Sequence, residues 1–223
     1  MTYIHTLKRI RDKKTNYRKR SSLLLSKKNF VTIKFSNQNV LTQLIEPHLS
    51  GDRVIAYAHS SNLENLGWKG SLNSIPASYL TGLLLGKKAS HDGFGEAVLY
   101  TGKDQYTQRT ASCLKGIIDG GLKIPVSVDS FPSENRIRGE HISEYALLLK
   151  EDKDLYTTRF SSMIKRGLTP EEYKVHFEEI KNNILNSDLN INRKVEESKK
   201  IKNNLKRKQK EKTIETKEEA ENQ

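Results

Sequence analysis

The sequence contains almost no cysteine and no long apolar run. Cys113 is the single cysteine among 223 residues, which excludes an internal disulfide framework and a zinc site built from cysteines. A reducing compartment is therefore expected. The longest apolar stretch, Ile75–Gly86, is well short of the roughly 18 to 20 residues that a membrane-spanning helix needs. Since no signal peptide is recognisable either, we expect a soluble intracellular protein with no membrane partner.

Motifs of enzymes and metal sites are also missing. Residues 82–88 superficially match a phosphate-binding loop, but three residues separate the two glycines where four are needed, and Lys88 stands where a Ser or Thr is required. The six histidines are dispersed and have no cysteine partners at ligand spacing. His59 ends a predicted strand, but no nucleophile elbow accompanies it. We therefore expect no catalysis, no cofactor and no bound metal.

Positive charge is what the sequence has in excess. The net charge is +12 and the isoelectric point is about 9.6, which favours a polyanionic partner. Residues 1–28 hold ten Lys or Arg and one Asp, whereas residues 29–150 hold 12 basic and 11 acidic residues. A run of charge is ordinarily a solvated surface. A nearly neutral body behind so basic an arm is more typical of a protein that grips nucleic acid.

The apolar residues, 35% of the chain, are concentrated in the middle of the sequence. Alternation of apolar and polar residues predicts strands over 30–35, 40–45, 53–59 and 96–101. Helical periodicity predicts two helices, one from Pro76 and one over 107–119. Gly82 and Gly86 are expected to let the first of them pack closely on the sheet. The segment 124–144 is predicted to be a short strand or loop followed by a turn.

The two ends of the chain differ from this middle part. A helix is predicted over 15–25, capped by Thr15 or Asn16. Its docking face is predicted to hold four residues, and these are Tyr17, Ser21, Leu24 and Leu25. Another helix is predicted over 170–185 because Thr169 and Pro170 make a good helix start. From Asn186 the chain is rich in Lys, Glu and Asn, so a solvated helix or a disordered tail is expected.

Side chains that suit RNA gather in the N-terminal half. The arm offers cations for phosphates, and Tyr17 is placed either to pack on the body or to stack on a base. The first hairpin is expected to present hydrogen-bonding groups on one exposed side, namely Lys34, Ser36, Asn37 and Gln43. Each signal is weak alone, because polar residues on exposed strands are ordinary. Their concentration in one region favours RNA binding.

Several stretches together resemble a known family. They are, in order, Thr15–Arg20 before a leucine run, Ala58–Ser61, Gly67–Gly70, Pro76–Gly82, Leu114–Gly116 with Asp119–Leu122, and Arg136–Ile142. They are similar to the universal large-subunit ribosomal protein that binds 5S rRNA, in its archaeal and eukaryotic form (archaeal protein eighteen, eukaryotic protein five). The resemblance extends from about residue 5 to residue 185.

This resemblance implies an α/β fold with a single βββαβα core on a mixed sheet, a basic N-terminal extension and a helical, charged C-terminal extension. It implies a structural role in the large subunit of the cytoplasmic ribosome, with 5S rRNA attached at the central protuberance. The implied partners are 5S rRNA, 23S-type large-subunit rRNA and neighbouring large-subunit proteins. The expected segments are an RNA-binding extension (1–28), the core (29–150), a helical extension (151–185) and a charged tail (186–223).

The RNA-binding surface that the resemblance implies comprises Arg9, Arg11, Lys13, Lys14, Asn16, Tyr17, Arg18, Lys19, Arg20, Lys34, Ser36, Asn37, Trp68, Lys69 and Gly70. The chain departs from the family pattern at Ser71–Ile75, where a Gly-containing stretch is usual, so a close backbone approach to RNA is not expected there. Two alternatives remain open. One is a nucleic-acid-binding protein without selectivity for a ribosomal RNA. The other is a nucleotide-dependent or hydrolytic α/β enzyme, which would need a site that the sequence lacks.

Overall fold

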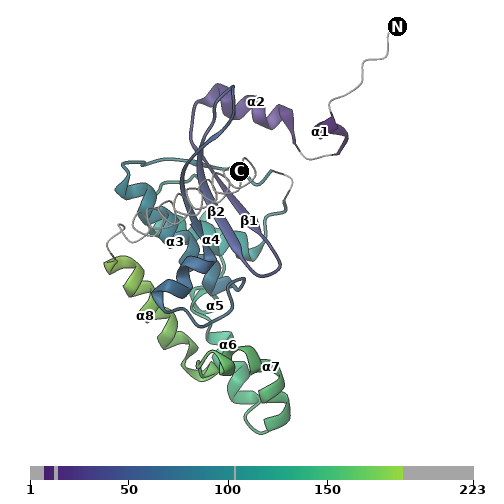
Figure 1. The fold of residues 1–223 in the computed structure, drawn as a ribbon, viewed down its shortest axis with the longest axis vertical. Helices are drawn as coiled ribbons and strands as arrows, with labels where there is room; N and C mark the ends of the chain where they lie inside the picture. The colour runs from purple at the N-terminus through teal and green to yellow at the C-terminus, as the bar shows by residue number, and fades with distance from the viewer. Residues whose placement is uncertain (1–7, 13–14, 103, 188–223) are drawn as a thin grey trace, which may run out of the picture. The chain divides into compact units, whose positions relative to one another are not determined.

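The structure is a computed structural model that describes residues 8–12, 15–102 and 104–187. One four-stranded mixed sheet has the order β3-β2-β1-β4 (Figure 1). The strands β1 (Phe30–Phe35), β2 (Val40–Glu46) and β3 (Arg53–His59) are antiparallel neighbours, and β4 (Val98–Leu99) runs parallel to β1. The α/β fold with a mixed sheet is confirmed. The fourth strand is shorter than predicted, because only Val98 and Leu99 pair with β1, while Glu96 forms an isolated bridge with Lys123.

The two faces of the sheet follow from the alternation in β1. Val31 and Ile33 face the helices and belong to the buried core. Thr32 is paired with Gln43 of β2, and Lys34 is paired with Leu41, on the opposite face. We call the helix-covered side the inner face and the other side the outer face.

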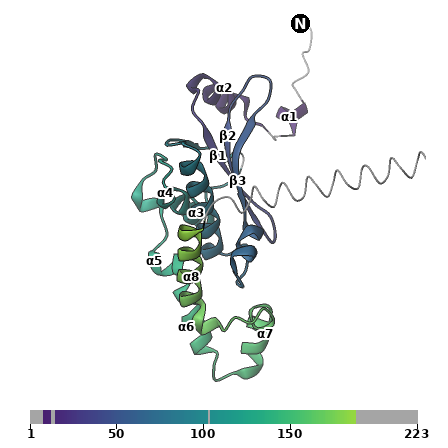
Figure 2. The ribbon, with the colours of Figure 1, turned by 60° about the vertical axis from the view of Figure 1, so that its left-hand side comes forward.

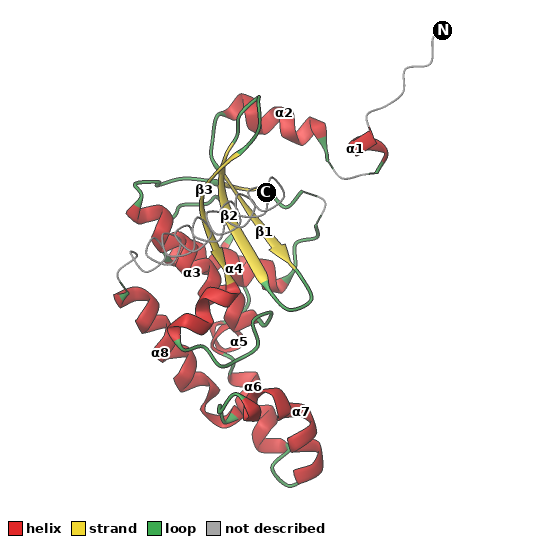
Figure 3. Cartoon of the chain, in the orientation of Figure 1, coloured by secondary structure: helices red, strands yellow, loops and turns green. Residues whose placement is uncertain are grey.

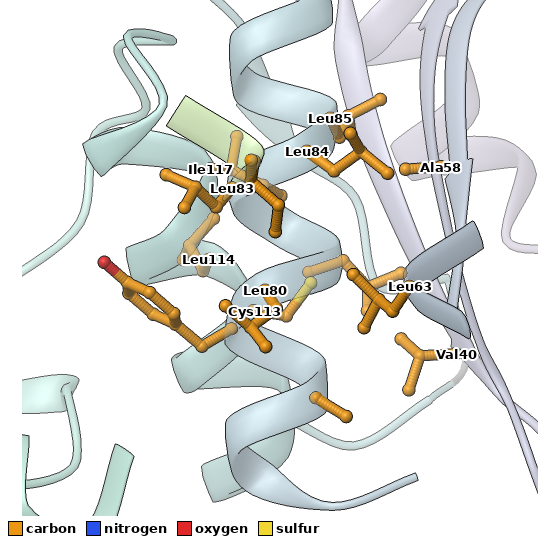
Figure 4. Close-up of a cluster of buried hydrophobic side chains, with 14 of the residues drawn as sticks. Val40, Ala58, Leu63, Leu80, Leu83, Leu84, Leu85, Cys113, Leu114 and Ile117 are labelled. Carbon is orange, nitrogen blue, oxygen red and sulfur yellow. The ribbon is translucent and has the colours of Figure 1, made fainter. Parts of the chain in front are cut away.

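Two helices form the layer on the inner face (Figure 3). Helix α3 (Ile75–His91) begins with Ser74 as its N-cap, and α4 (Gln108–Asp119) begins with a capping box from Thr107. The core side chains of α3 lie between the sheet and α4. Figure 4 shows Leu84 and Leu85 on the side of Ala58, with Leu114 and Ile117 on the other side of the helix.

The glycines of α3 serve its contact with α4. A Cβ added at Gly82 would lie 2.0 Å from the carbonyl oxygen of Cys113, and one at Gly86 would lie 2.3 Å from that of Ile117. From the other helix, a Cβ at Gly116 would lie 2.1 Å from the carbonyl oxygen of Tyr79. The prediction that Gly82 and Gly86 pack on the sheet was therefore wrong. Periodicity places a small residue on a helix face but does not say which element lies against it.

The segment between the core and the C-terminal part is helical. It contains the 3-10 turn η2 (Val128–Ser130), α5 (Glu134–Arg138) and α6 (Glu140–Leu148). The loop predicted at the start of 124–144 is present, but the turn predicted after it was wrong, because α5 and the first part of α6 lie there. Gly139, with a φ of +83°, ends α5 and precedes α6. Two helices this short give no sustained periodicity in the sequence.

Besides the two helices of the basic arm, α1 (Lys8–Arg11) and α2 (Tyr17–Ser26), the remaining helices are η1 (Ser60–Leu66), α7 (Lys153–Lys165), η3 (Pro170–Glu172) and α8 (Tyr173–Asn186). The helix predicted over 170–185 is confirmed. Its Phe177, Ile180 and Ile184 join the core, and the Lys87 Nζ donates to the carbonyl oxygen of Ile184, so α8 lies beside α3 (Figure 2). Within the described ranges, none of the helices is both long and apolar enough to cross a bilayer.

Candidate nucleic-acid interface

The basic arm contains α1 (Lys8–Arg11) and α2 (Tyr17–Ser26). Asn16 is the N-cap of α2, because its side-chain oxygen accepts a hydrogen bond from the Lys19 N–H at 3.2 Å. Lys27 ends the helix in a left-handed conformation with a φ of +51°. Of the two predicted caps, Asn16 is therefore the one used. Lys13 and Lys14 lie outside the described residues, as does the predicted tail from residue 188 on.

Helix α2 is attached to the body through Arg20. Its guanidinium donates to both carboxylate oxygens of Asp52, in the turn between β2 and β3, and to the His48 carbonyl oxygen at 3.4 Å. The hydrogen bond to Asp52 raises the pKa of Arg20 above its ordinary value, and the carboxylate charge adds to this effect. Arg20 thus holds the arm in place, whereas Arg18 and Lys19 are exposed and form no ion pair with another described residue.

The docking face of α2 differs from the predicted one. Leu23 and Leu24 are half-buried beside Arg20, while Leu25 is 84% exposed and Ser21 faces solvent. The prediction was right for Leu24 and wrong for Ser21 and Leu25, because it could not include the charged Arg20 in the docking face. The bidentate pair with Asp52 sets the rotation of the helix, and this partner is 32 residues away in the sequence.

We predict that Arg20 and Asp52 stabilise the docked arm as a pair. Both side chains are partly buried, at 21% and 29% exposure, so a double-mutant cycle of Arg20→Ala and Asp52→Ala should give a coupling energy of about 1 kcal/mol in urea unfolding. Trypsin should cut either single variant in α2 faster than the wild type. The exchanged pair, Arg20→Asp with Asp52→Arg, should recover part of the protection. Additive effects of the two single changes would contradict the pairing.

Two side chains hold the tip of the first hairpin, one from the loop just before α3 and one from α4. The Asn73 Nδ2 donates to the carbonyl oxygens of Ser36 and Asn37 at 3.0 and 3.1 Å. Arg109 in turn donates to the Asn73 Oδ1 at 2.8 Å and lies over the Phe35 ring at 4.9 Å. Asn73 belongs to the stretch that departs from the family pattern, and here it holds the turn in place. The sequence did not predict the roles of Asn73 and Arg109, because nothing local marks a contact across 36 residues.

The hairpin and the arm meet at one groove. Arg9, Tyr17 and Arg20 of the arm line it together with Lys34 of β1. The structure therefore brings four of the predicted RNA-binding residues to one place. Lys34, Ser36 and Asn37 are exposed, so their side chains are accessible to a partner.

The loop Trp68–Gly70 is placed differently, because it packs on α8. The Trp68 side chain is 3% exposed, stacks on His176 with ring centroids 5.2 Å apart and meets the edge of Tyr173 at 5.5 Å. Gly70 is buried against the same indole. Lys69 is exposed, but its Nζ donates to the Gly167 carbonyl oxygen at 3.3 Å. The Trp68 indole is therefore part of the core. The sequence does not predict its burial, because the partner helix α8 lies about a hundred residues later in the chain.

His176 makes this contact sensitive to pH. Its Nε2 accepts a hydrogen bond from the Lys69 N–H at 3.1 Å, so the neutral ring is the form that fits. Burial lowers the pKa of His176 below the ordinary value of 6.5, and the charge of Lys69 acts in the same direction, against Glu179. Burial also lowers the pKa of His141.

We predict that the unfolding free energy falls as the pH drops below 6.5. A base whose pKa is lowered by folding binds more protons when unfolded, so its stabilising effect is present above the unfolded pKa and is lost as the pH falls. His176→Gln keeps an acceptor and should flatten this fall, and His141→Gln should flatten it independently. Urea unfolding from about pH 7.5 to 5.5 measures both. An unchanged slope in both variants would contradict the assignment.

Comparison with known proteins agrees with the resemblance in the sequence. The family described as "Ribosomal large subunit proteins 60S L5, and 50S L18" matches residues 2–112, which include the arm, the sheet and α3. The large ribosomal subunit protein uL18 of Ignicoccus hospitalis is 46% identical over 182 residues, covering 80% of this chain and 89% of that protein. This chain, with its basic arm and α/β body, therefore belongs to the uL18 family, whose members are structural proteins of the large ribosomal subunit.

Proposed function

We propose that this protein binds 5S rRNA and helps to attach it to the large subunit at the central protuberance. The observation that carries the proposal is the attachment of a cationic arm to a nearly neutral body. Arg20 is bound to Asp52, so α2 holds Arg18 and Lys19 outward in a fixed orientation. Cations held in this way bind phosphates with less loss of conformational entropy than cations on a free tail.

We expect the affinity for RNA to come mainly from electrostatic attraction, and the selectivity to come from the folded structure of the RNA. Each Lys or Arg that neutralises a phosphate releases counterions, and this term does not depend on the base sequence. Selectivity for one RNA comes from its folded shape and from unpaired bases that reach the protein. The polar hairpin tip at Ser36 and Asn37, which Asn73 holds in place, is available for such contacts.

The other parts of the protein are assigned to neighbouring ribosomal components. Large-subunit rRNA and adjacent ribosomal proteins are the partners of its remaining surface, and the protein performs no chemical step. Tyr145, Leu147, Leu148 and Leu155 are exposed apolar side chains on α6 and α7, which project away from the sheet in both Figure 1 and Figure 2. Exposed apolar side chains that gather in one region are typical of a surface covered in an assembly.

Competition between RNAs tests the proposal. The purified full-length chain should bind the cognate 5S rRNA at least about tenfold more tightly than bulk transfer RNA at the same salt concentration. Equal affinity would overturn the assignment and favour a nucleic-acid-binding protein without selectivity. In cell extract, the protein should sediment with the large subunit and leave it together with 5S rRNA in high salt. Release of the protein with 5S rRNA still attached to the subunit would count against a role in its attachment.

A further inference from the structure

The groove between the arm and the outer face of the sheet has the size of a small-molecule site. Its volume is about 490 Å³, within the range of pockets that hold a ligand of nucleotide size. Phe30 and Thr32 of β1, Tyr17 of the arm and Tyr100, which follows β4, are among the residues that line it. The Arg20–Asp52 pair, which joins α2 to the turn between β2 and β3, also lines this groove.

Thr32 is the unusual residue of this groove. It is 8% exposed, and its hydroxyl is buried without a hydrogen-bond partner among the described residues. Three other buried threonines are all satisfied by the fold. Thr42 donates to the Ala58 carbonyl oxygen, Thr81 to that of Ala77, and Thr110 exchanges hydrogen bonds with Thr107. Because buried polar groups are nearly always paired, an unpaired hydroxyl on a residue that lines the groove points to a partner that enters it once the Thr32 side chain turns toward the groove.

The walls of the groove suit a planar aromatic ring. Phe30 and Tyr100 lie edge to face with centroids 5.5 Å apart, and Tyr17, which also lines the groove, remains 37% exposed. Aromatic side chains of this kind bind unpaired bases by stacking, with little dependence on which base is present. Apolar and aromatic walls with one polar group match a nucleobase better than they match a phosphate.

The charged residues of the groove suit different parts of a nucleotide, since the cations suit its phosphates and the carboxylate suits its base. Arg9 and Lys34 also line the groove, and their charges suit the phosphates of an inserted nucleotide. Asp104 also lines the groove and forms no ion pair with another described residue. Its carboxylate repels a phosphate and accepts hydrogen bonds from the N–H groups of a base.

We propose that this groove binds one unpaired nucleotide of the RNA, with its base between Tyr17 and Tyr100 and its edge bonded to Thr32 and Asp104. The inference rests on the proposed function, since an RNA must first bind the arm. It adds a single position at which the protein contacts a base rather than the backbone. Such a contact gives selectivity that phosphate binding alone does not supply.

Two substitutions test the site, each with a matched control. Thr32→Val removes the hydroxyl with little change of shape and should weaken 5S rRNA binding about three- to tenfold. Tyr17→Leu removes a stacking surface and should weaken it about tenfold or more. Thr42→Val removes a buried hydroxyl from the inner face, and Tyr57→Leu removes an exposed ring on β3 that does not line the groove. Both controls should bind as the wild type does.

Chemical probing of the RNA bases identifies the bound nucleotide. One unpaired base of 5S rRNA should be protected in the wild-type complex and should become reactive again with Thr32→Val and Tyr17→Leu. Ultraviolet cross-linking should attach a nucleotide to Tyr17, Phe30 or Tyr100. If the wild type prefers 5S rRNA but both variants bind equally well with unchanged protections, this inference fails while the proposed function stands. If the wild type shows no preference for 5S rRNA, the proposed function fails first.

Discussion

Replacing Gly82 by alanine should destabilise the fold by about 3 kcal/mol or more, although alanine is the better helix former. In a helix interior this exchange ordinarily stabilises by roughly 0.5–1 kcal/mol. Here the new Cβ would lie 2.0 Å from the Cys113 carbonyl oxygen, and an α4 backbone atom cannot rotate away as a side chain does. The clash therefore exceeds the gain, and α3 and α4 must separate or tilt.

The control for this change is Gly95→Ala. A Cβ at Gly95 meets nothing within 4 Å, and the residue does not have a positive φ, so stability should stay within about 0.5 kcal/mol of the wild type. Gly116→Ala introduces a clash at the same interface from α4, and it should lower the unfolding free energy about as much as Gly82→Ala. The two together should cost less than the sum, because one separation of the helices relieves both clashes.

Urea unfolding followed by circular dichroism gives these values. A loss of about 3 kcal/mol should also lower the melting temperature by roughly 6 to 12 °C in a chain of this size. A Gly82→Ala variant that unfolds at the wild-type urea concentration would show that the helices can move apart without penalty. The close packing of α3 on α4 would then not be a main source of stability.

The sequence predicts the elements of the core well because their patterns are local. The alternation in β1 places Val31 and Ile33 inward, and the apolar stripe of α3 is complete within one helix. Contacts between elements are predicted less well, because they join residues that lie far apart in the sequence. Gly82 was assigned to the sheet since a sequence shows which face of a helix is small but not its neighbour. The helices within 124–144 were missed because α5 and α6 are too short to establish a period.

The candidate site shows the same division between local and distant information. The cationic character of the arm follows from composition alone, and the local sequence limits the cap of α2 to Thr15 or Asn16, of which the structure uses Asn16. The different role of Arg20 depends on Asp52, and the burial of Trp68 depends on α8. No sequence motif marks Asp52 or α8 as the partner in these contacts. The groove at Thr32 combines the arm, β1 and the segment after β4, so no single stretch of sequence contains it.

The affinity for 5S rRNA should fall on the order of a thousandfold when the salt concentration rises from ~50 to ~200 mM. Besides Arg20, six cations of the arm are predicted to contact phosphates, and they are Arg9, Arg11, Lys13, Lys14, Arg18 and Lys19. Each contact adds about 0.9 to the slope of the logarithm of affinity against that of salt. The slope for the wild type should therefore be about −5.

Removing Arg18 and Lys19 together should change that slope to about −3.5 and weaken binding at low salt, while the fold remains intact. Both side chains are exposed, so their loss removes phosphate contacts and little else. The matched control is Lys123→Ala with Lys165→Ala, which removes two exposed lysines from other segments. If net charge alone attracted the RNA, the two double variants would weaken binding equally. If α2 lies on the phosphates, as the Arg20–Asp52 anchor implies, the slope changes in the first variant and stays at the wild-type value in the second.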